Sequence, residues 1–371
     1  MSNVFIKTKV RSGSSAVKYL QNLKGRRIMV VCDKFLAENG AVRYITDAVS
    51  ANNQVEIFDQ AIPDPTIEVV GRGLTMICKS KPDVLIGFGG GSAIDTAKGI
   101  IYFAGVKELV PKPLFITVPT TSGTGSEVTS AAVITDSDAK VKHLITTDDI
   151  LADVALLDAQ LTLSVPAPVT ANTGMDVLTH ALEAYVATRA NVFSDALAEK
   201  AMELLTHNLL ACYQNGKNLA VRTAMHEAST LAGMAFNNAG LGVNHSIAHQ
   251  LGSTFHIPHG LANAILLNQV IDYNCANRET MEKYAVLAKK LQLAPCDASA
   301  ETAVAALKLM ISMLMQCMHM AAHVSELKIS REEYQRQIPT MVENALMDHC
   351  INTTPRNIGT MGIRNILEAV Y

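Results

Sequence analysis

The stretch Asp83-Val-Leu-Ile-Gly-Phe-Gly-Gly-Gly-Ser-Ala-Ile-Asp-Thr-Ala-Lys-Gly-Ile-Ile-Tyr102 decides the fold of the chain around it. Residues 83–88 form a short apolar run typical of a buried strand, Gly89–Ser92 form a loop, and residues 93–102 have a helical pattern. Glycines in such a loop let backbone N–H groups approach a pyrophosphate, and the amino end of the helix favours its negative charge. The loop alone is weak support, because tight strand-to-helix turns often need glycine for conformation, and Ser92 stands where a G-x-G-x-x-G motif has its last glycine.

The same alternation of short apolar runs and helical segments continues on both sides of this stretch. Helices are expected to begin near Ala16 and Thr66, and residues 4–10 alternate as an edge strand does. Further strands are expected at residues 27–33, 54–58, 114–118 and 154–157. This order predicts a parallel α/β sheet.

A second loop, Pro119-Thr-Thr-Ser-Gly-Thr-Gly-Ser-Glu127, follows the strand at 114–118. Its hydroxyl groups suit hydrogen bonds to ribose or phosphate oxygens, although they also suit a turn and a helix cap. Two such loops after neighbouring strands mark the edge where an open α/β sheet binds its ligand. The pair of loops therefore predicts a nucleotide site that neither loop would predict alone.

Strand signals fade after Pro166-Ala-Pro168, and the remaining chain is helical in pattern. A linker near residue 165 separates a dinucleotide-binding α/β domain, residues 1–165, from an all-helical domain, residues 166–371. Helices are expected at residues 176–186, 194–210, 221–236, 243–251 and 262–273, with others to the carboxyl end. Residues 281–371 show no recognisable site, and their histidines are assigned structural or surface roles.

The helical half holds four of the eleven histidines, His245, His249, His256 and His259, within fifteen residues that contain no Lys or Arg. His245 and His249 are four apart and share one helical face, as do Asp176 and His180 upstream. A single histidine on an apolar helix is more often structural than a ligand. The two pairs together predict a site of one Asp and three His, and His259 returns after a Pro-containing turn. The seven cysteines form no Cys-x-x-Cys and offer no competing zinc pattern.

Composition excludes several classes of protein. A net charge of -3 over 371 residues gives no reason to expect nucleic acid or an anionic membrane as a partner. The amino terminus lacks a secretory pattern, no apolar run approaches membrane-spanning length, and unpatterned cysteines fit a reducing compartment, so a cytoplasmic location is expected. Residues 223–277 contain no Lys or Arg, which favours a small neutral substrate over a carboxylate or phosphate.

Over essentially its whole length the chain resembles the iron-containing (group III) alcohol dehydrogenase family. The resemblance rests on Gly89–Ser92 with Asp95 and Lys98, on the loop 119–127, on Thr173-Gly-Met-Asp-x-x-x-His-Ala-x-Glu183, and on His245-x-x-x-His249-x-Leu-Gly with Pro258-His259-Gly260. It implies a Rossmann-like parallel sheet followed by an all-α metal-binding domain, the architecture that dehydroquinate synthase also has.

Matched to the family, the metal ligands are Asp176, His180, His245 and His259. His249 then lies beside the metal near substrate and nicotinamide, and our hypothesis is that it assists proton transfer. Asp33 matches the acid that binds the adenine ribose, and its charge should repel a 2′-phosphate, so NAD is favoured over NADP. The other cofactor contacts that the resemblance implies are Gly89, Gly90, Gly91, Ser92, Asp95, Thr120, Thr121, Thr124 and Lys142. Asn244 departs from the small or aliphatic residue that many members have.

Ligand chemistry admits Fe(II) or Zn(II), and the resemblance favours iron. Within the family the chain is most similar to the branch of bacterial propanediol utilisation, which implies reduction of propionaldehyde to 1-propanol with NADH. Ethanol, lactaldehyde and 1,3-propanediol enzymes of the family are alternatives.

The resemblance also implies a homo-oligomer, for which strand 4–10 is a natural pairing edge, and enclosure in a bacterial microcompartment. Two rival classes are a lyase of the dehydroquinate synthase type and a structural component of such a compartment.

Overall fold

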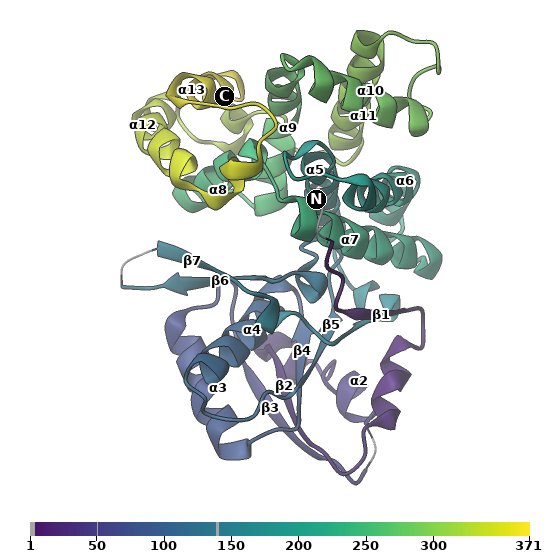
Figure 1. Cartoon of the computed structure of the whole chain (residues 1–371), viewed down its shortest axis with the longest axis vertical. Coiled ribbons are helices and arrows are strands. Elements are labelled where there is room, and N and C mark those ends of the chain that lie inside the picture. The colour runs from purple at the N-terminus through teal and green to yellow at the C-terminus, as the bar shows by residue number, and fades with distance from the viewer. Residues whose placement is uncertain (1–3, 50, 139–140) are drawn as a thin grey trace. The chain divides into compact units, whose positions relative to one another are not determined.

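The computed structural model describes residues 4–49, 51–138 and 141–371 of the chain. They pack as two compact units, one formed by Phe5–Ser164 and the other by Val165–Tyr371, which also includes Val4 (Figure 1). The first is built around a parallel sheet and the second is helical, so the fold class predicted from the sequence is confirmed.

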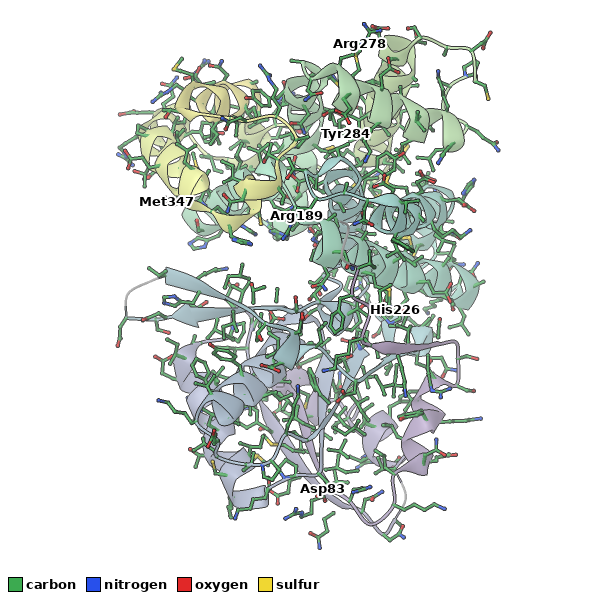
Figure 2. The ribbon with its side chains drawn as sticks, viewed as in Figure 1. Asp83, Arg189, His226, Arg278, Tyr284 and Met347 are labelled. Atoms are coloured by element: carbon green, nitrogen blue, oxygen red, sulfur yellow. The ribbon has the colours of Figure 1, made fainter. Side chains whose placement is uncertain are left out.

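Six parallel strands form the sheet of the first unit, in the order β1-β8-β5-β4-β2-β3. Strands that are parallel and consecutive in the chain, such as β2 with β3 and β4 with β5, are joined by crossover connections, as parallel pairing requires. Their bounds are β1 Lys9–Ser12, β2 Arg27–Asp33, β3 Gln54–Ala61, β4 Val84–Gly89, β5 Leu114–Pro119 and β8 Val154–Leu157. At the start of β4, Asp83 accepts hydrogen bonds from the backbone N–H and the side chain of Arg27, which fixes the register of β4 against β2 (Figure 2).

Both faces of the sheet are covered, because successive strand residues point to opposite faces. In β2, Ile28, Val30 and Cys32 join a core with the short helices η1 and α2, whereas Met29 and Val31 join a separate core with α3 and α4. This explains why the strands read as continuous apolar runs in the sequence. The helices of this unit are η1 Ala16–Asn22, α1 Lys34–Glu38, α2 Arg43–Thr46, α3 Ile67–Ser80, α4 Gly91–Val106, η2 Ser126–Val128, η3 Asp148–Ile150 and η4 Ala159–Thr162.

Two features of this unit differ from the sequence-based expectation. The edge strand expected at residues 4–10 is β1 at Lys9–Ser12, which pairs with β8, while residues 4–8 have no regular structure. A separate antiparallel hairpin, β6 Ala131–Asp136 with β7 Val141–Thr146, was not expected. The exposed pattern of β7 explains the omission, since it lacks the apolar alternation by which strands are recognised.

A single hydrophobic core joins the helices of the second unit. Its most buried element is α5, in which every residue from 174 to 186 is buried. Another deeply buried residue is Tyr284, whose hydroxyl accepts a hydrogen bond from Asn274 (Figure 2). The helices are α5 Ala167–Val186, α6 Val192–Gln214, α7 Leu219–Ala239, α8 Val243–Phe255, α9 His259–Cys275, α10 Arg278–Lys290, α11 Ala300–Cys317, η5 Val324–Leu327, α12 Arg331–Met347, η6 His349–Thr353 and α13 Thr360–Ala369.

The start of α5 differs from the sequence-based expectation, which placed the beginning of this helix at Asp176. The helix begins at Ala167, nine residues before the expected start, and Pro168 lies in its first turn. Proline is tolerated there because the first N–H groups of a helix have no partner within the helix.

Helix α11 is long and apolar enough to cross a membrane by length and composition alone, which the sequence analysis did not recognise. Its buried side chains, among them Leu307 and Ile311, belong to the core of the helical unit, and the helix packs against α10 and α9. These contacts are those of a core helix.

Candidate functional site

Helix α5 contributes three polar side chains that face one buried point in the helical unit. Asp176, His180 and Glu183 lie at i, i+4 and i+7, so the helical repeat places them on one face. Each is about 4% exposed. Groups this polar are rarely buried without partners, so the face must meet complementary groups on other helices.

These complementary groups come from the first turns of α8 and α9. His245 is the third residue of α8 and His259 is the first residue of α9. Measured from Oδ1 of Asp176, the Nε2 atoms of His259, His245 and His180 lie at 3.4, 3.6 and 3.8 Å. The structure thus brings together all four residues that the resemblance implies as metal ligands.

The four side chains fit a divalent metal ion. Their ligand atoms all lie within 4.8 Å of one another. Donor atoms that hold one ion at about 2.0–2.2 Å in a tetrahedral arrangement are about 3.3–3.6 Å apart. One carboxylate and three imidazoles also suit both Fe(II) and Zn(II) and leave the bound ion with a net positive charge.

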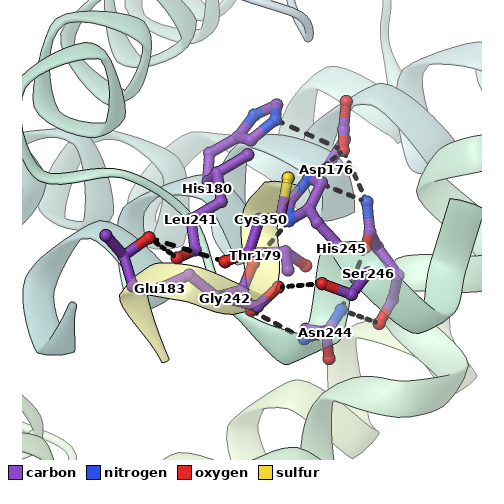
Figure 3. A network of polar contacts seen from close by, with 12 residues as sticks. Asp176, Thr179, His180, Glu183, Leu241, Gly242, Asn244, His245, Ser246 and Cys350 are labelled. Carbon is purple, nitrogen blue, oxygen red and sulfur yellow. Dashed lines mark hydrogen bonds and ion pairs between the residues drawn. The ribbon is translucent and has the colours of Figure 1, made fainter. Parts of the chain in front are cut away.

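Glu183 orients His245 (Figure 3). Its Oε2 lies 2.5 Å from Nδ1 of His245, and its Oε1 accepts the backbone N–H of Asn244 at 2.8 Å. When Nδ1–H donates to the carboxylate, the lone pair of Nε2 points toward Asp176 and is available to an ion. The sequence motif ending in Glu183 contained this residue, and its i+3 spacing from His180 was a usable signal, but no role was assigned to it.

Asn263, which was not among the site residues predicted from the sequence, contacts the ligands from the other side of the site. Its Nδ2 donates to Oδ1 of Asp176 at 2.9 Å and lies 3.2 Å from Nε2 of both His245 and His259. Asn244 in turn donates to Oδ1 of Asn263 at 2.9 Å, and both amides are fully buried. The unusual residue noted at 244 therefore supports the ligands through a second amide.

The protonation state of each ligand depends on the charges of its neighbours. Burial opposes the charged form of Asp176, but the neighbouring histidines outweigh it and lower the pKa of that carboxyl. Burial likewise opposes protonation of His245, and hydrogen bonds to Asp176 and Glu183 outweigh it, raising its pKa to about 9. Although 43% of the His259 side chain is exposed, desolvation and the adjacent imidazoles lower its pKa. Binding of a cation would replace a proton at His245.

His249 lies beside the four-residue set but is held by a different partner. Its ring stacks on that of His259 at 5.4 Å between centroids, and its Nδ1 is 2.8 Å from Oδ2 of Asp348. Asp348 precedes η6 and also accepts the backbone N–H of Cys350. Residues 281–371, in which the sequence showed no recognisable site, thus supply a partner to His249. No spacing rule links positions 99 residues apart, so the sequence held no signal for the pair.

The loops of the α/β unit meet at one edge of the sheet, because β2, β4 and β5 are parallel neighbours. Asp33 ends β2, Gly89 ends β4, and the backbone N–H of Thr120 donates to the carbonyl of Gly89. Gly89 has a φ of 144°, which only glycine adopts readily, and Oδ2 of Asp33 lies close to it. Side chains of Thr121 and Thr124 lie where a Cβ atom at Gly90 or Gly91 would meet them, so this loop has no room for larger residues.

Helix α4 begins in this loop with backbone N–H groups directed at the same edge. Its cap residue, Gly90, supplies no side-chain hydrogen bond, and Ser92 follows in the first turn. Oδ1 of Asp33 accepts a hydrogen bond from the backbone N–H of Leu36 and so caps α1. A helix amino end that lacks a side-chain cap, next to hydroxyls and one carboxylate, is suited to a pyrophosphate with its ribose.

Two of the expected cofactor residues have other partners. Asp95 accepts hydrogen bonds from Oγ of Ser126 at 2.6 Å and from the N–H of Val133, which ties α4 to the second loop and to β6. Lys142 lies on β7, where its Nζ is 2.6 Å from Asp64 and both side chains are largely exposed.

The chain also matches two protein-family models. The description "Iron-containing alcohol dehydrogenase" matches residues 7–159, and "Fe-containing alcohol dehydrogenase family, C-terminal" matches residues 170–371. The chain belongs to the iron-containing alcohol dehydrogenase family. It is therefore an oxidoreductase of alcohols and aldehydes, and the lyase alternative loses its support.

Individual relatives cover the whole chain. It is 44% identical over 368 residues to 1-propanol dehydrogenase PduQ of Citrobacter freundii, covering 99% of both chains. Among solved structures, a 1,3-propanediol oxidoreductase superposes with a TM-score of 0.92 at 35% identity, with both chains fully covered. Sulfoacetaldehyde reductase from Bifidobacterium kashiwanohense, solved in complex with NAD+, gives a TM-score of 0.88 at 25% identity, covering 100% of this chain and 98% of that one.

Proposed function

We propose that this alcohol dehydrogenase interconverts a short-chain aldehyde and its primary alcohol with NAD(H), and that propionaldehyde and 1-propanol are the pair it serves. The observation that carries the proposal is the set of Asp176, His180, His245 and His259, whose ligand atoms all lie within 4.8 Å of one another. Similarity to a 1-propanol dehydrogenase supports the choice of substrate, and 1,3-propanediol is the alternative that a second relative supports.

In this proposal the four side chains hold Fe(II), and Zn(II) is the competing ion. A bound divalent cation supplies Lewis-acid polarisation of a carbonyl oxygen. Glu183 keeps the lone pair of His245 directed inward, and Asn263 keeps Asp176 in place. Because both supports are buried, the ligands are held before the substrate arrives.

His249 is proposed as the group that moves the proton. Asp348 accepts a hydrogen bond from Nδ1–H, which leaves Nε2 as the nitrogen that exchanges a proton. Its side chain is 41% exposed, so a proton can pass between it and water. The four ligands are excluded from this role because their donor lone pairs hold the ion.

We infer NAD rather than NADP from the charge of Asp33 at the end of β2. A carboxylate there accepts hydrogen bonds from ribose hydroxyls and repels a 2′-phosphate. Gly89, Gly90, Gly91, Ser92, Asp95, Thr120, Thr121, Thr124 and Lys142 are the further residues proposed to bind or shape the cofactor site. Of these, Asp95 acts by joining the two loops.

The proposal also covers the charge of the substrate, the oligomeric state and the location of the enzyme. Residues 223–277 carry no Lys or Arg, so the metal-lining segment offers no cation to an acidic substrate. A homo-oligomer in the cytoplasm, enclosed with other enzymes of propanediol utilisation, is the arrangement that the similarity to PduQ supports.

The test is anaerobic reconstitution with Fe(II) or Zn(II), followed by NADH oxidation with propionaldehyde, acetaldehyde, lactaldehyde and 3-hydroxypropionaldehyde. We expect the iron form to turn over fastest with propionaldehyde. A faster rate with 3-hydroxypropionaldehyde would move the assignment to 1,3-propanediol, and no turnover with any of them would refute the proposed substrate class.

His249→Ala tests the proton-transfer role separately. We expect kcat to fall about 100-fold or more with a changed pH profile while metal content is unchanged. His256→Ala, in the turn after α8, is the matched control. An unaltered rate and pH profile in His249→Ala would remove this residue from the mechanism.

A further inference from the structure

A second group of side chains that could bind a metal lies beside the four proposed metal ligands and shares no residue with them. Ligand atoms of His249, Asp348 and Cys350 all lie within 4.8 Å of one another. Nδ1 of His249 is 2.8 Å from Oδ2 of Asp348, and the thiol of Cys350 lies within 4.8 Å of ligand atoms of both. A thiol, an imidazole and a carboxylate are the three ligand types from which zinc sites are built.

The backbone holds the three groups in place. Helix α8 carries His249 and contacts η6, which begins one residue before Cys350. Asp348 caps η6, because its Oδ1 accepts the N–H of Cys350 at 2.8 Å. Two of the three ligands are thus fixed relative to each other by a cap, and the third is on a helix packed against them.

We propose that His249, Asp348 and Cys350 form a second, inhibitory site for a thiophilic divalent cation such as Zn2+. Each contributes one donor atom, and water completes the coordination, since three protein ligands leave an open position. Thiolate and imidazole donors favour zinc over Mg2+, which prefers oxygen ligands. Because occupancy involves the proposed proton-transfer residue, this inference rests on the proposed function for its inhibitory effect, but not for the binding itself.

Binding balances in charge and protons. Cys350 loses its thiol proton to solvent, and the proton on Nδ1 of His249 leaves as the ion binds there, while Nε2 takes one up. The resulting site holds one thiolate, one carboxylate, one neutral imidazole and one divalent cation, so its net charge is zero. A neutral site next to the positively charged catalytic one avoids most of the repulsion between two ions.

Inhibition by the second ion follows from the change of tautomer at His249. In the free enzyme Asp348 accepts Nδ1–H, so Nε2 of His249 can accept a proton. With the second ion on Nδ1, Nε2 carries the hydrogen and has no lone pair to offer. The ion therefore disables proton transfer without displacing the catalytic metal.

Cobalt(II) provides a readout that does not depend on activity, because only the second site contains sulfur. Titration of the metal-free full-length protein with Co2+ should give a thiolate-to-cobalt charge-transfer band in the near ultraviolet with the second equivalent. We expect the band to be absent in Cys350→Ser and to be retained in Cys317→Ser, which alters an exposed cysteine on α11. His180→Ala disrupts only the catalytic site. In this variant the first equivalent of Co2+ should therefore already give the band.

Inhibition is measured on the iron-loaded enzyme with rising Zn2+, each variant being normalised to its own rate. Half-inhibition of Cys350→Ser should need at least about tenfold more Zn2+ than wild type, and Mg2+ should not inhibit either. Asp348→Asn is a second variant, for use if Cys350→Ser does not fold, and it should weaken the cobalt band. A band that persists in Cys350→Ser, or no band in wild type, would overturn the site. A band without any zinc inhibition would leave the second site intact and refute only the assigned role of His249.

Discussion

Glu183 is the residue on which the proposed metal site depends most, although it binds no ion itself. Its carboxylate accepts Nδ1–H of His245 and is buried, so it holds that imidazole with Nε2 directed at the metal site. We expect Glu183→Gln to weaken Fe(II) or Zn(II) binding about 10- to 100-fold, because loss of a carboxylate partner of a liganding histidine has effects of this size. Competition with a chelator measures the affinity. Glu203→Gln, on the exposed face of α6, is the control, and equal affinities in the two variants would contradict the role.

The charge of Asp33 makes a second prediction at this scale. Asp33→Asn removes the charge but keeps an oxygen to cap α1 at Leu36, so the loop should fold normally. We expect the ratio of kcat/KM with NADPH to that with NADH to rise about tenfold or more, since the repulsion of a 2′-phosphate is lost. Asp47→Asn, at an exposed position after α2, is the control. An unchanged ratio would show that Asp33 does not select the cofactor.

Elements were predictable from the sequence where one periodicity dominated. The strands of the sheet were found because both of their faces are buried, and the helices of the second unit because their apolar faces repeat. The hairpin β6–β7 was not found, since β7 is exposed. Ligands grouped within a motif were also predictable, whereas Asn263 and Asp348 were not, because their contacts join helices distant in sequence.

Helix α4 depends on a buried cation for its contact with the second loop. Lys98 is fully buried and donates to Oγ of Ser126, Oγ1 of Thr129 and the carbonyl of Ala131. Burial lowers its pKa to about 8, whereas a lysine in the unfolded chain titrates near about 10.4. Between these values the unfolded chain binds more protons than the native one, so this lysine makes the free energy of unfolding rise with pH.

Lys98→Met should remove that dependence. Measured by urea unfolding from about pH 8 upward, the stability of wild type relative to Lys98→Met should increase with pH, while that of wild type relative to Lys18→Met should stay constant. The variant should also bind NADH more weakly, because α4 and the loop at 119–127 lose their shared contact. Parallel stability profiles for wild type and Lys98→Met would mean that Lys98 keeps its proton in the native state as it does in the unfolded chain, so that its pKa is not lowered.

The whole molecule combines a sheet unit proposed to bind the cofactor with a helical unit whose proposed metal ligands all come from α5, α8 and α9. Metal removal should therefore affect the two units differently. Saturating metal at about 100 times Kd stabilises whatever it binds by about 2.7 kcal/mol. We expect calorimetry of the metal-free protein to show a lower melting temperature for the helical unit and an unchanged one for the sheet unit. Equal shifts in both transitions would indicate that the units unfold together.

The protons of the site set the pH dependence of this stabilisation. The pKa of His245 is raised to about 9 in the metal-free protein, so the stability that its protonation provides is present below about pH 6.5 and is lost as the pH rises through about 9. A metal ion needs the unprotonated Nε2 and must displace that proton, so its affinity should increase with pH over the same interval. Titration calorimetry at pH 7 in buffers of different ionisation enthalpy should detect about one proton released per ion bound. Glu183→Gln weakens one of the interactions that raise this pKa and should release fewer protons, and an equal release from both proteins would assign the proton to another ligand.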